Sequence, residues 1–279
     1  MKRIDSSANP RYKALRRLVE SSRERARSGL SVLDGAHLVA AYLDHAGQPE
    51  QVAVSRQGAQ DPEIRALLAR MAGADAVVLG DAQFAALSSV VTPTGILAVV
   101  NTPRPQPHPR DMEACLMLEE LQDPGNLGSI LRSCAAAGVG HVLLSRGSAH
   151  AWSPRVLRAG MGAHFALAIY EGADLREAAR DFGGTRVATR PAAPQSIFDS
   201  DLGGRIALML GNEGAGLSAE LLATADRVVS IPMPGKAESL NIAAAAAVCL
   251  FERVRQLSDA GLPRPQGANK PNTGQTPGG

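Results

Sequence analysis

Six short, largely apolar segments in the second half of the chain constrain its fold more than any other sequence feature. Continuous apolar runs are typical of parallel strands that are buried on both faces of a sheet. Stretches with helical periodicity separate the runs, as crossover helices would. The pattern therefore predicts an α/β fold, with a mostly parallel sheet and helices on both faces. The expected strands are residues 115–118, 142–144, 166–169, 186–189, 206–210 and 228–231.

The first hundred residues predict a separate, smaller α/β unit. A basic amphipathic helix is expected over residues 6–27, a strand over 30–33 and a helix over 35–44, and strand and helix patterns then alternate to residue 100. Four alternating prolines follow, and this pattern is typical of a semi-rigid linker. The predicted domains are residues 1–101 and 113–260, joined by a linker at 102–112 and followed by a disordered tail at 261–279.

The N-terminal segment is strongly basic, although the net charge of the whole chain is only +2. Residues 1–27 hold nine Lys or Arg and three Asp or Glu. Cationic side chains on one helix suit RNA phosphates, and a solvated helix face is the alternative. Aromatic residues are only 3% of the chain, so recognition by shape and phosphate is favoured over base stacking. The candidate phosphate contacts are Arg11, Lys13, Arg16 and Arg17.

The cysteines indicate neither a metal site nor a disulfide framework. The chain has three, Cys115, Cys134 and Cys249, with no CxxC pair and no Cys/His spacing typical of zinc. No metal is therefore expected, and a reducing cytoplasm is the expected compartment. The N-terminus lacks the apolar run of a signal peptide, and the Ala-rich run near residue 243 is too short for a membrane span.

A first polar motif follows the strand expected at 115–118. After an Asp-Pro-Gly turn, Asn126 is expected to be the N-cap of a helix, and Arg132 lies nearly two turns further on. Open α/β sheets bind ligands outside the carboxyl ends of their strands, so both side chains are candidate site residues. The alternative is that Asn126 only caps the helix and that Arg132 is a surface charge.

A second motif follows the strand expected at 206–210. Gly211, Gly214 and Gly216 permit positive φ angles and a close approach of the backbone to a ligand. Their GxxGxG spacing is neither a P-loop nor the GxGxxG fingerprint, which disfavours an NAD-dependent dehydrogenase. Glu213 lies inside this loop, either as a site residue or as a solvated carboxylate.

A third motif follows the strand expected at 228–231. Pro232 and Pro234 stiffen the loop, and Ser239 is expected to begin an Ala-rich helix that runs to about residue 257. The alanines at 243–247 give this helix a narrow wall, against which a ligand or another backbone can pack closely. Tight helix packing without a ligand is the alternative.

In this order, the three motifs resemble those of the SpoU (TrmH-like) family of SPOUT RNA 2′-O-ribose methyltransferases. The resemblance covers about residues 113–256. It is also seen in the first half, where Asn9-Pro10, residues 33–39 and residues 92–98 resemble an L30e-like substrate-binding domain. Asp34 stands where the family usually has Glu, and Gly160 where it commonly has Ser. The matched motif positions are Asn126, Gly128, Ile130 and Arg132, then Gly211, Glu213, Gly216 and Leu217, then Ile231, Pro232, Ser239, Leu240 and Asn241.

The resemblance implies an S-adenosylmethionine cofactor, a homodimer, and a deep trefoil knot in the C-terminal domain that involves about residues 208–247. It also implies transfer of a methyl group to a ribose 2′-hydroxyl. The cofactor is expected to lie bent in the knot and to be held largely by backbone groups. The residues expected to bind it are Thr189, Leu210, Gly211, Ile231, Pro232, Ser239, Leu240 and Asn241.

The resemblance also implies roles for the catalytic candidates, Arg132, Asn126, Glu213 and Asn241. Because arginine is normally protonated, Arg132 is expected to position the hydroxyl or a phosphate and to stabilise negative charge, rather than to act as a base. Asn126 and Asn241 orient the ribose or Arg132, and Glu213 pairs with Arg132 or shapes the cofactor loop. Ser239 is expected to cap the last helix.

The L30e-like domain implies an rRNA substrate, most simply 23S rRNA, rather than tRNA. Two alternatives remain open. One is a tRNA 2′-O-methyltransferase, and the other is an RNA-binding homologue without catalytic activity. The sequence names no target nucleotide.

Overall fold

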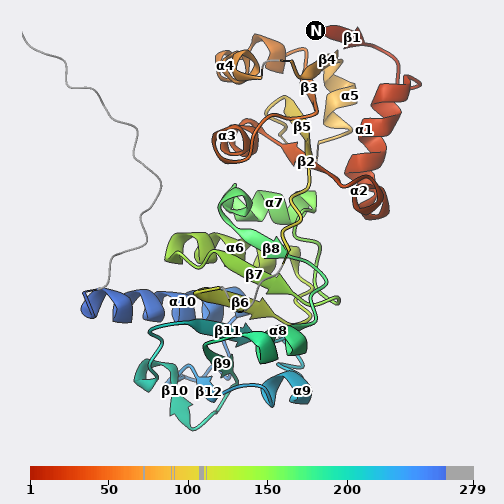
Figure 1. Ribbon diagram of the computed structural model, residues 1–279. Coiled ribbons are helices and arrows are strands. Elements are labelled where there is room, and N and C mark those ends of the chain that lie inside the picture. The colour runs from red at the N-terminus through yellow and green to blue at the C-terminus, as the bar shows by residue number, and fades with distance from the viewer. Residues whose placement is uncertain (72, 89, 91, 107–109, 111, 262–279) are drawn as a thin grey trace, which may run out of the picture.

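The computed structural model describes residues 1–71, 73–88, 90, 92–106, 110 and 112–261. In this part of the chain, the strands form two sheets, one in an N-terminal unit (β1 to β5) and one in a C-terminal unit (β6 to α10) (Figure 1). The predicted α/β class is confirmed. Most of the predicted tail, residues 262–279, and part of the predicted linker lie outside the described residues.

The N-terminal sheet is mixed, with strand order β1-β4-β3-β5-β2. β3 pairs with β4 in parallel and with β5 in antiparallel orientation, and β5 also pairs antiparallel with β2. The edge strand β1 pairs parallel with β4 and was not expected from the sequence. The strands are β1 (Lys2–Ile4), β2 (Leu30–Asp34), β3 (Gln51–Ser55), β4 (Asp75–Leu79) and β5 (Ile96–Asn101).

The single basic helix expected over residues 6–27 is wrong, because the chain forms two helices that meet at Ser21. Ser21 has extended backbone angles, and its side chain accepts a hydrogen bond from the Glu24 backbone N–H, so it ends one helix and caps the next. The helices of this unit are α1 (Pro10–Glu20), α2 (Ser22–Ser28), α3 (Ala36–His45), η1 (Gly58–Gln60), α4 (Pro62–Arg70) and α5 (Asp81–Ala85).

The C-terminal sheet is parallel at every strand pair, in the order β10-β12-β9-β11-β6-β7-β8. All five residues of β11, near the middle of the sheet, are buried, which explains its continuous apolar sequence. The predicted parallel sheet is therefore confirmed. Its strands are β6 (Ala114–Leu118), β7 (His141–Leu144), β8 (Ala168–Tyr170), β9 (Thr185–Thr189), β10 (Gln195–Ser196), β11 (Ile206–Leu210) and β12 (Arg227–Ser230).

Helices cover both faces of this sheet. One apolar cluster joins one sheet face to α6, α7 and α10, and a second cluster joins the opposite face to α8 and α9. The α6–α7 contact is very close, because a Cβ at Gly128 would meet Ala159 and the backbone of Gly160. The helices are α6 (Pro124–Ala137), α7 (Pro154–Gly160), η2 (Ala163–Ala166), α8 (Leu175–Asp181), η3 (Ile197–Asp199), α9 (Ala219–Leu222) and α10 (Ile242–Asp259).

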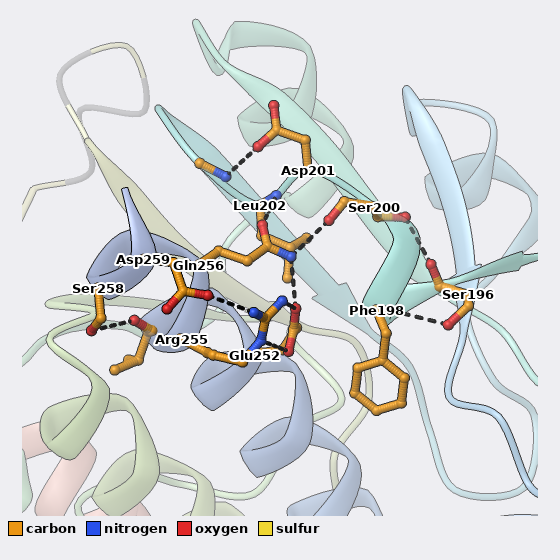
Figure 2. Close-up of polar contacts among 12 residues, drawn as sticks. Ser196, Phe198, Ser200, Asp201, Leu202, Glu252, Arg255, Gln256, Ser258 and Asp259 are labelled. Carbon is orange, nitrogen blue, oxygen red and sulfur yellow. Dashed lines mark hydrogen bonds and ion pairs between the residues drawn. The ribbon is translucent and has the colours of Figure 1, made fainter. Parts of the chain in front are cut away.

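The C-terminal half of α10 is fixed by polar contacts to the loop after η3 (Figure 2). The Gln256 side chain accepts a hydrogen bond from the Leu202 backbone at 2.8 Å and donates to the Ser200 carbonyl at 2.9 Å. The buried Arg253 donates to the carbonyls of Leu202 and Gly204. These contacts hold the last helix against the sheet. The trefoil knot stays a prediction from the resemblance.

The two units contact each other through α7 and η2. His37 of α3 and the backbone carbonyl of Met161 are 3.3 Å apart, and the rings of Tyr42 and Phe165 pack edge to face with centroids 5.4 Å apart. Met161 has a φ of 49°, unusual for a residue other than glycine, and it ends α7 in the left-handed region. The N-terminal unit therefore rests on the helix that packs against α6.

His164, under this contact, is a buried neutral base. Its side chain is 1% exposed, and its Nε2 lies 2.8 Å from the Ala151 carbonyl. The Nδ1 atom is buried and has no hydrogen-bond partner among the described residues. Burial lowers the pKa of His164 to about 4. The folded protein therefore keeps this ring neutral at pH values where the unfolded chain protonates it.

We expect His164 to make folding sensitive to mild acid. Above the unfolded pKa near 6.5, the ring is neutral in both states, and the buried neutral ring does not oppose folding. As pH falls toward 4, the unfolded chain binds a proton that the folded protein does not, so the free energy of unfolding decreases. The free energy of unfolding should decrease by about 3 kcal/mol more in the native protein than in His164→Gln, which keeps a donor for Ala151. Urea unfolding from pH 7 to pH 4 measures this. The same loss in both proteins would refute the assignment, and His45→Gln, at an exposed position, is the control.

Candidate active site at the carboxyl edge of the C-terminal sheet

Three loops meet beyond the carboxyl ends of the C-terminal strands. They follow β6, β11 and β12, and they span residues 119–123, 211–218 and 231–241. β6 and β11 are neighbours, and β9 separates β11 from β12. Because all these strands are parallel, the three polar motifs of the sequence lie at one edge, where open α/β sheets bind ligands.

Asp123, not Asn126, is the N-cap of α6, so the predicted cap is wrong. The Asp123 carboxylate accepts a hydrogen bond from the Asn126 backbone N–H at 2.7 Å, and Pro124 occupies the first helical turn. Proline suits this turn because its missing N–H would have no partner there. Asn126 therefore lies inside the helix, and its side-chain amide is available for other contacts.

A chain of side-chain hydrogen bonds joins Asn241, Asn126 and Glu213. The Asn241 oxygen caps α10 by accepting from the backbone N–H groups of Ala243, at 2.9 Å, and Ala244, at 3.4 Å. Its amide nitrogen is thereby directed to the Asn126 oxygen, 3.0 Å away. The Asn126 amide nitrogen in turn donates to Glu213. One helix cap therefore fixes the orientation of both amides.

The expectation that Ser239 begins and caps this helix is wrong, because α10 begins at Ile242 and its cap is Asn241.

The glycine loop after β11 is closed on itself. The backbones of Asn212 and Gly216 exchange hydrogen bonds of 3.0 and 2.8 Å, and Gly216 has a φ of 70°. A Cβ at Gly211 would collide with the backbone of Gly216 and Leu217. Glycine is therefore required at 211, and the tight loop presents Glu213 to Asn126.

Polar contacts that the sequence did not suggest join this loop to the end of β6. The Glu119 carboxylate accepts hydrogen bonds from both the backbone N–H and the hydroxyl of Ser218, each at 2.7 Å. The Asn212 amide donates to the Glu120 carbonyl at 2.9 Å, and Glu120 has a φ of 51°. A strained residue of this kind is common at functional sites. The sequence signal that could have revealed these contacts is the pair of adjacent acids, Glu119 and Glu120, directly after a buried strand.

A hollow opens beside the hydrogen-bonded chain. Among the predicted cofactor residues, Ser239, Leu240 and Asn241 line it, and Leu240 is 40% exposed. Leu210 and Gly211 are buried at the end of β11, and Ile231 and Pro232 begin the third loop. Thr189 ends β9, and its hydroxyl donates to the Met209 carbonyl at 3.3 Å. The complete lining is Asp123, Asn126, Glu213, Ser239, Leu240 and Asn241.

The third loop offers unused backbone groups. Within the described part of the chain, residues 232–240 make no backbone–backbone hydrogen bond. Most of these residues are exposed. Their N–H and C=O groups can therefore bind a polar small molecule without giving up contacts in the protein. That backbone groups hold the cofactor stays a prediction.

Arg132 lies apart from the hydrogen-bonded chain. It is six residues after Asn126 on α6, which places it about 9 Å along the helix axis and on a different side of the helix. Its side chain is exposed and makes no hydrogen bond or ion pair with the described residues. Glu213 contacts Asn126 instead of pairing with Arg132. The Arg132 guanidinium is thus available to a ligand.

The four N-terminal cations are all exposed on α1. Two have acidic partners, because Arg11 lies 2.8 Å from Asp75, and Arg16 lies 2.7 Å from Glu20. Exposed ion pairs of this kind contribute little, so a phosphate can compete for these side chains. The side chains of Lys13 and Arg17 form no hydrogen bond or ion pair with the described residues, so their cationic groups remain available to a phosphate.

The cysteines take no part in the site. All three are free and buried, and burial raises the pKa of each thiol to about 12. The thiols therefore stay protonated and are not nucleophiles. In the described residues, no group of three or more His, Cys, Asp or Glu side chains is placed to hold a metal ion. No helix among those residues is both long and apolar enough to span a membrane.

Comparison with known families matches both units of the chain. The model of the SpoU rRNA Methylase family covers residues 113–251, which include all three loops of the site. The model of the MRM3-like substrate binding domain covers residues 9–98. The chain belongs to the SpoU rRNA methylase family. The family assignment made from the motifs is therefore confirmed.

Individual relatives agree over nearly their full length. The chain is 31% identical to the 23S rRNA (guanosine(2553)-2′-O)-methyltransferase RlmP of Bacillus subtilis, over 90% of this chain and 98% of that protein. An AdoMet-bound rRNA methyltransferase from Sinorhizobium meliloti has a TM-score of 0.81 and 28% identity, over 92% and 98% of the two chains. AviRb from Streptomyces viridochromogenes, in complex with AdoMet, has a TM-score of 0.79 and 29% identity, over 89% and 98%.

The double role of Asn241 can be separated by two substitutions. Asn241→Ala removes the cap of α10 and should lower the free energy of unfolding by about 1 kcal/mol. Asn241→Asp should keep most of that stability, since aspartate caps equally well, but it loses the donor to Asn126. Urea unfolding measures the first effect, and a crystal structure of Asn241→Asp should show the Asn126 amide released. Equal stability losses in the two variants would contradict the capping role.

Proposed function

We propose that this protein is an S-adenosylmethionine-dependent RNA 2′-O-ribose methyltransferase that acts on 23S rRNA. The observation that carries the proposal is the Asn241–Asn126–Glu213 chain, held beside an open hollow at the sheet edge. Membership of the SpoU family and similarity to two AdoMet-bound structures support the reaction and the cofactor.

The residues around the hollow fit S-adenosylmethionine. The free backbone groups of residues 232–240 suit its polar atoms, and the exposed Leu240 offers an apolar contact for its base. Glu213 and Asp123 place carboxylates on the hollow, which suits a ligand that carries positive charge. When bound, the cofactor supplies an electrophilic methyl group on a sulfonium whose leaving group is a neutral thioether.

Arg132 acts on the RNA. Because its guanidinium is protonated and has no partner in the described residues, it can hold the 2′-hydroxyl or an adjacent phosphate and stabilise the oxygen as its proton is lost. The oriented amides of Asn126 and Asn241 position the ribose. Glu213 fixes the Asn126 amide, so that its oxygen faces Asn241.

The names of several relatives support 23S rRNA as the substrate. RlmP of Bacillus subtilis is named for 23S rRNA, and so is RlmB of Pseudomonas putida, which is 30% identical over 82% of this chain. The MRM3-like unit is the part of this chain that would hold the RNA. The expected compartment is the cytoplasm, because its reducing environment suits three cysteines that are free thiols. Transfer of tritiated methyl groups to unmodified 23S rRNA, and not to a tRNA mixture, would support this substrate, whereas exclusive labelling of tRNA would overturn it.

Arg132→Ala should abolish methyl transfer while cofactor binding survives. Removal of one charge-stabilising donor typically lowers kcat about a hundredfold or more, and alanine is well tolerated at an exposed helical position. Tritiated methyl transfer measures the rate, and calorimetry measures S-adenosylmethionine affinity. Arg155→Ala, at another exposed arginine on α7, is the matched control. Loss of cofactor affinity in Arg132→Ala would contradict the role, and inactivity of the native protein toward any RNA would favour the catalytically silent alternative.

We also propose that the protein is a homodimer whose interface includes α10. Ala244, Ala247 and Phe251 follow one side of this helix at spacings of three and four residues, and Phe251 is 48% exposed. Phe198 of η3, which contacts α10, is 49% exposed, and its ring points away from the polar contacts that anchor the helix (Figure 2). Exposed aromatic side chains such as these are enriched in subunit interfaces.

Phe251→Glu should shift the protein from dimer to monomer, because a carboxylate at the interface would be desolvated without a partner. Light scattering coupled to gel filtration measures the mass. Met161→Glu, which changes a side chain that is 46% exposed but lies on the interdomain segment, should remain dimeric. A monomeric native protein, or a dimer unaffected by Phe251→Glu, would refute the α10 interface.

A further inference from the structure

A second hollow lies between the two units, outside the site described above. Its volume is about 560 Å³. The N-terminal side consists of α2 and residues 102–105, which follow β5, and the C-terminal side consists of the loops that follow β7 and β8. The residues that give it chemical character are Arg25, Arg104, Arg146, His150 and Glu171, and we call this hollow the interdomain cleft.

The interdomain cleft is positively charged. Three arginines line it, and the lining contains one carboxylate, Glu171. That carboxylate is already engaged, because it accepts a hydrogen bond from the Ala151 backbone at 2.7 Å and lies 3.7 Å from His150. Arg146 also lies close enough to the Asp174 carboxylate, just outside the lining, to help lower the pKa of that group. Three guanidinium groups against these two carboxylates still leave the cleft with an excess of positive charge, which attracts anions.

The three arginines differ in how they are held. Arg25 donates to the carbonyls of Leu18 and Val19 at 2.7 and 2.9 Å, so its stem is fixed and it ties α2 to α1. Arg104 makes one hydrogen bond, to the Ala26 carbonyl at 3.0 Å. Arg146 is exposed and donates no hydrogen bond to the described residues. Arg104 and Arg146 therefore keep most of their donors for a ligand.

The cleft is directly connected to the catalytic edge. The hydroxyl of Ser145 accepts a hydrogen bond from the Glu120 N–H at 2.8 Å, and that of Ser148 accepts from the Leu121 N–H at 3.2 Å. The loop after β7, which carries Arg146, is thereby fixed to the loop that leads into α6. β6, β7 and β8 are consecutive in the sheet, so the loops that line the cleft follow the two strands next to the one that leads into α6.

We propose that the interdomain cleft binds the phosphates of a single RNA strand that leads to the target ribose, with Arg104 and Arg146 as the principal contacts. This inference rests on the proposed function. Guanidinium groups match phosphate geometry, and phosphate contacts position a strand without specifying its sequence. The Trp152 and Tyr170 rings that line the cleft are only 5% and 7% exposed, so they offer no platform for base stacking. Together with the cations of α1, the cleft continues a basic path from the N-terminal helices to the catalytic edge.

The salt dependence of RNA binding tests this proposal directly. Each lost phosphate contact on a single strand reduces the slope of log affinity against log salt by about 0.7. The double variant Arg104→Gln/Arg146→Gln should therefore reduce the slope for oligouridylate by about 1.4. Arg25 is kept, because it supports the fold of α1 and α2. The control is Arg65→Gln/Arg180→Gln, which removes two exposed arginines of α4 and α8 outside the cleft and should leave the slope unchanged.

Methyl transfer separates this inference from the proposed function. In the cleft variant, the KM for unmodified 23S rRNA should rise about tenfold, while kcat and S-adenosylmethionine affinity stay constant. An unchanged salt slope, or an equal change in the control, overturns the cleft assignment even if the native enzyme is active. A reduced slope in the cleft variant, with no transfer by the native protein, supports the RNA-binding cleft and overturns the proposed function.

Discussion

The arrangement of the site depends on one asparagine that serves a helix and a ligand site together. The first N–H groups of α10 need acceptors, and the Asn241 oxygen supplies one. Because an amide has its donor opposite its acceptor, this cap leaves the Asn241 nitrogen directed at Asn126. The Asn126 nitrogen in turn donates to Glu213. With asparagine at position 241, the contact that caps the helix therefore also sets the direction of the other hydrogen bonds in the chain.

The architecture of the C-terminal unit could be predicted from its sequence because burial on both faces has a simple signature. A strand such as β11 has no polar face, and only a parallel sheet covered by helices accommodates that. Glycine at 211 was also informative, since a Cβ there would collide with the backbone of Gly216 and Leu217, where the loop closes on itself. The short strands β1 and β10 gave no comparable signal, because they have three and two residues and lie at sheet edges.

The details of the site were harder to predict because several residues compete for each role. Asn126 and Asp123 are both good helix caps, and the choice depends on Pro124, whose missing N–H suits the first turn. Ser239 and Asn241 compete in the same way at α10. The contacts from Glu119 to Ser218 cross 99 positions of sequence, and no local pattern specifies them. Spacing predicted three loops that the fold brings to one edge of the sheet, but tertiary contacts decided which atoms face the hollow.

The polar contacts in these loops also limit where a substrate can approach. Glu119, Asn212 and Asp123 use their side chains to hold the loops together. Among the described residues at this edge, the groups with unused hydrogen-bonding capacity include the backbone of residues 232–240, the guanidinium of Arg132 and that of Arg146. Residues 232–240 belong to the loop after β12, and Arg146 belongs to the loop after β7. These two strands lie on opposite sides of β6 in the sheet. A small molecule bound to residues 232–240 and an anionic strand bound to Arg146 would therefore meet over the amino end of α6, beside Asn126.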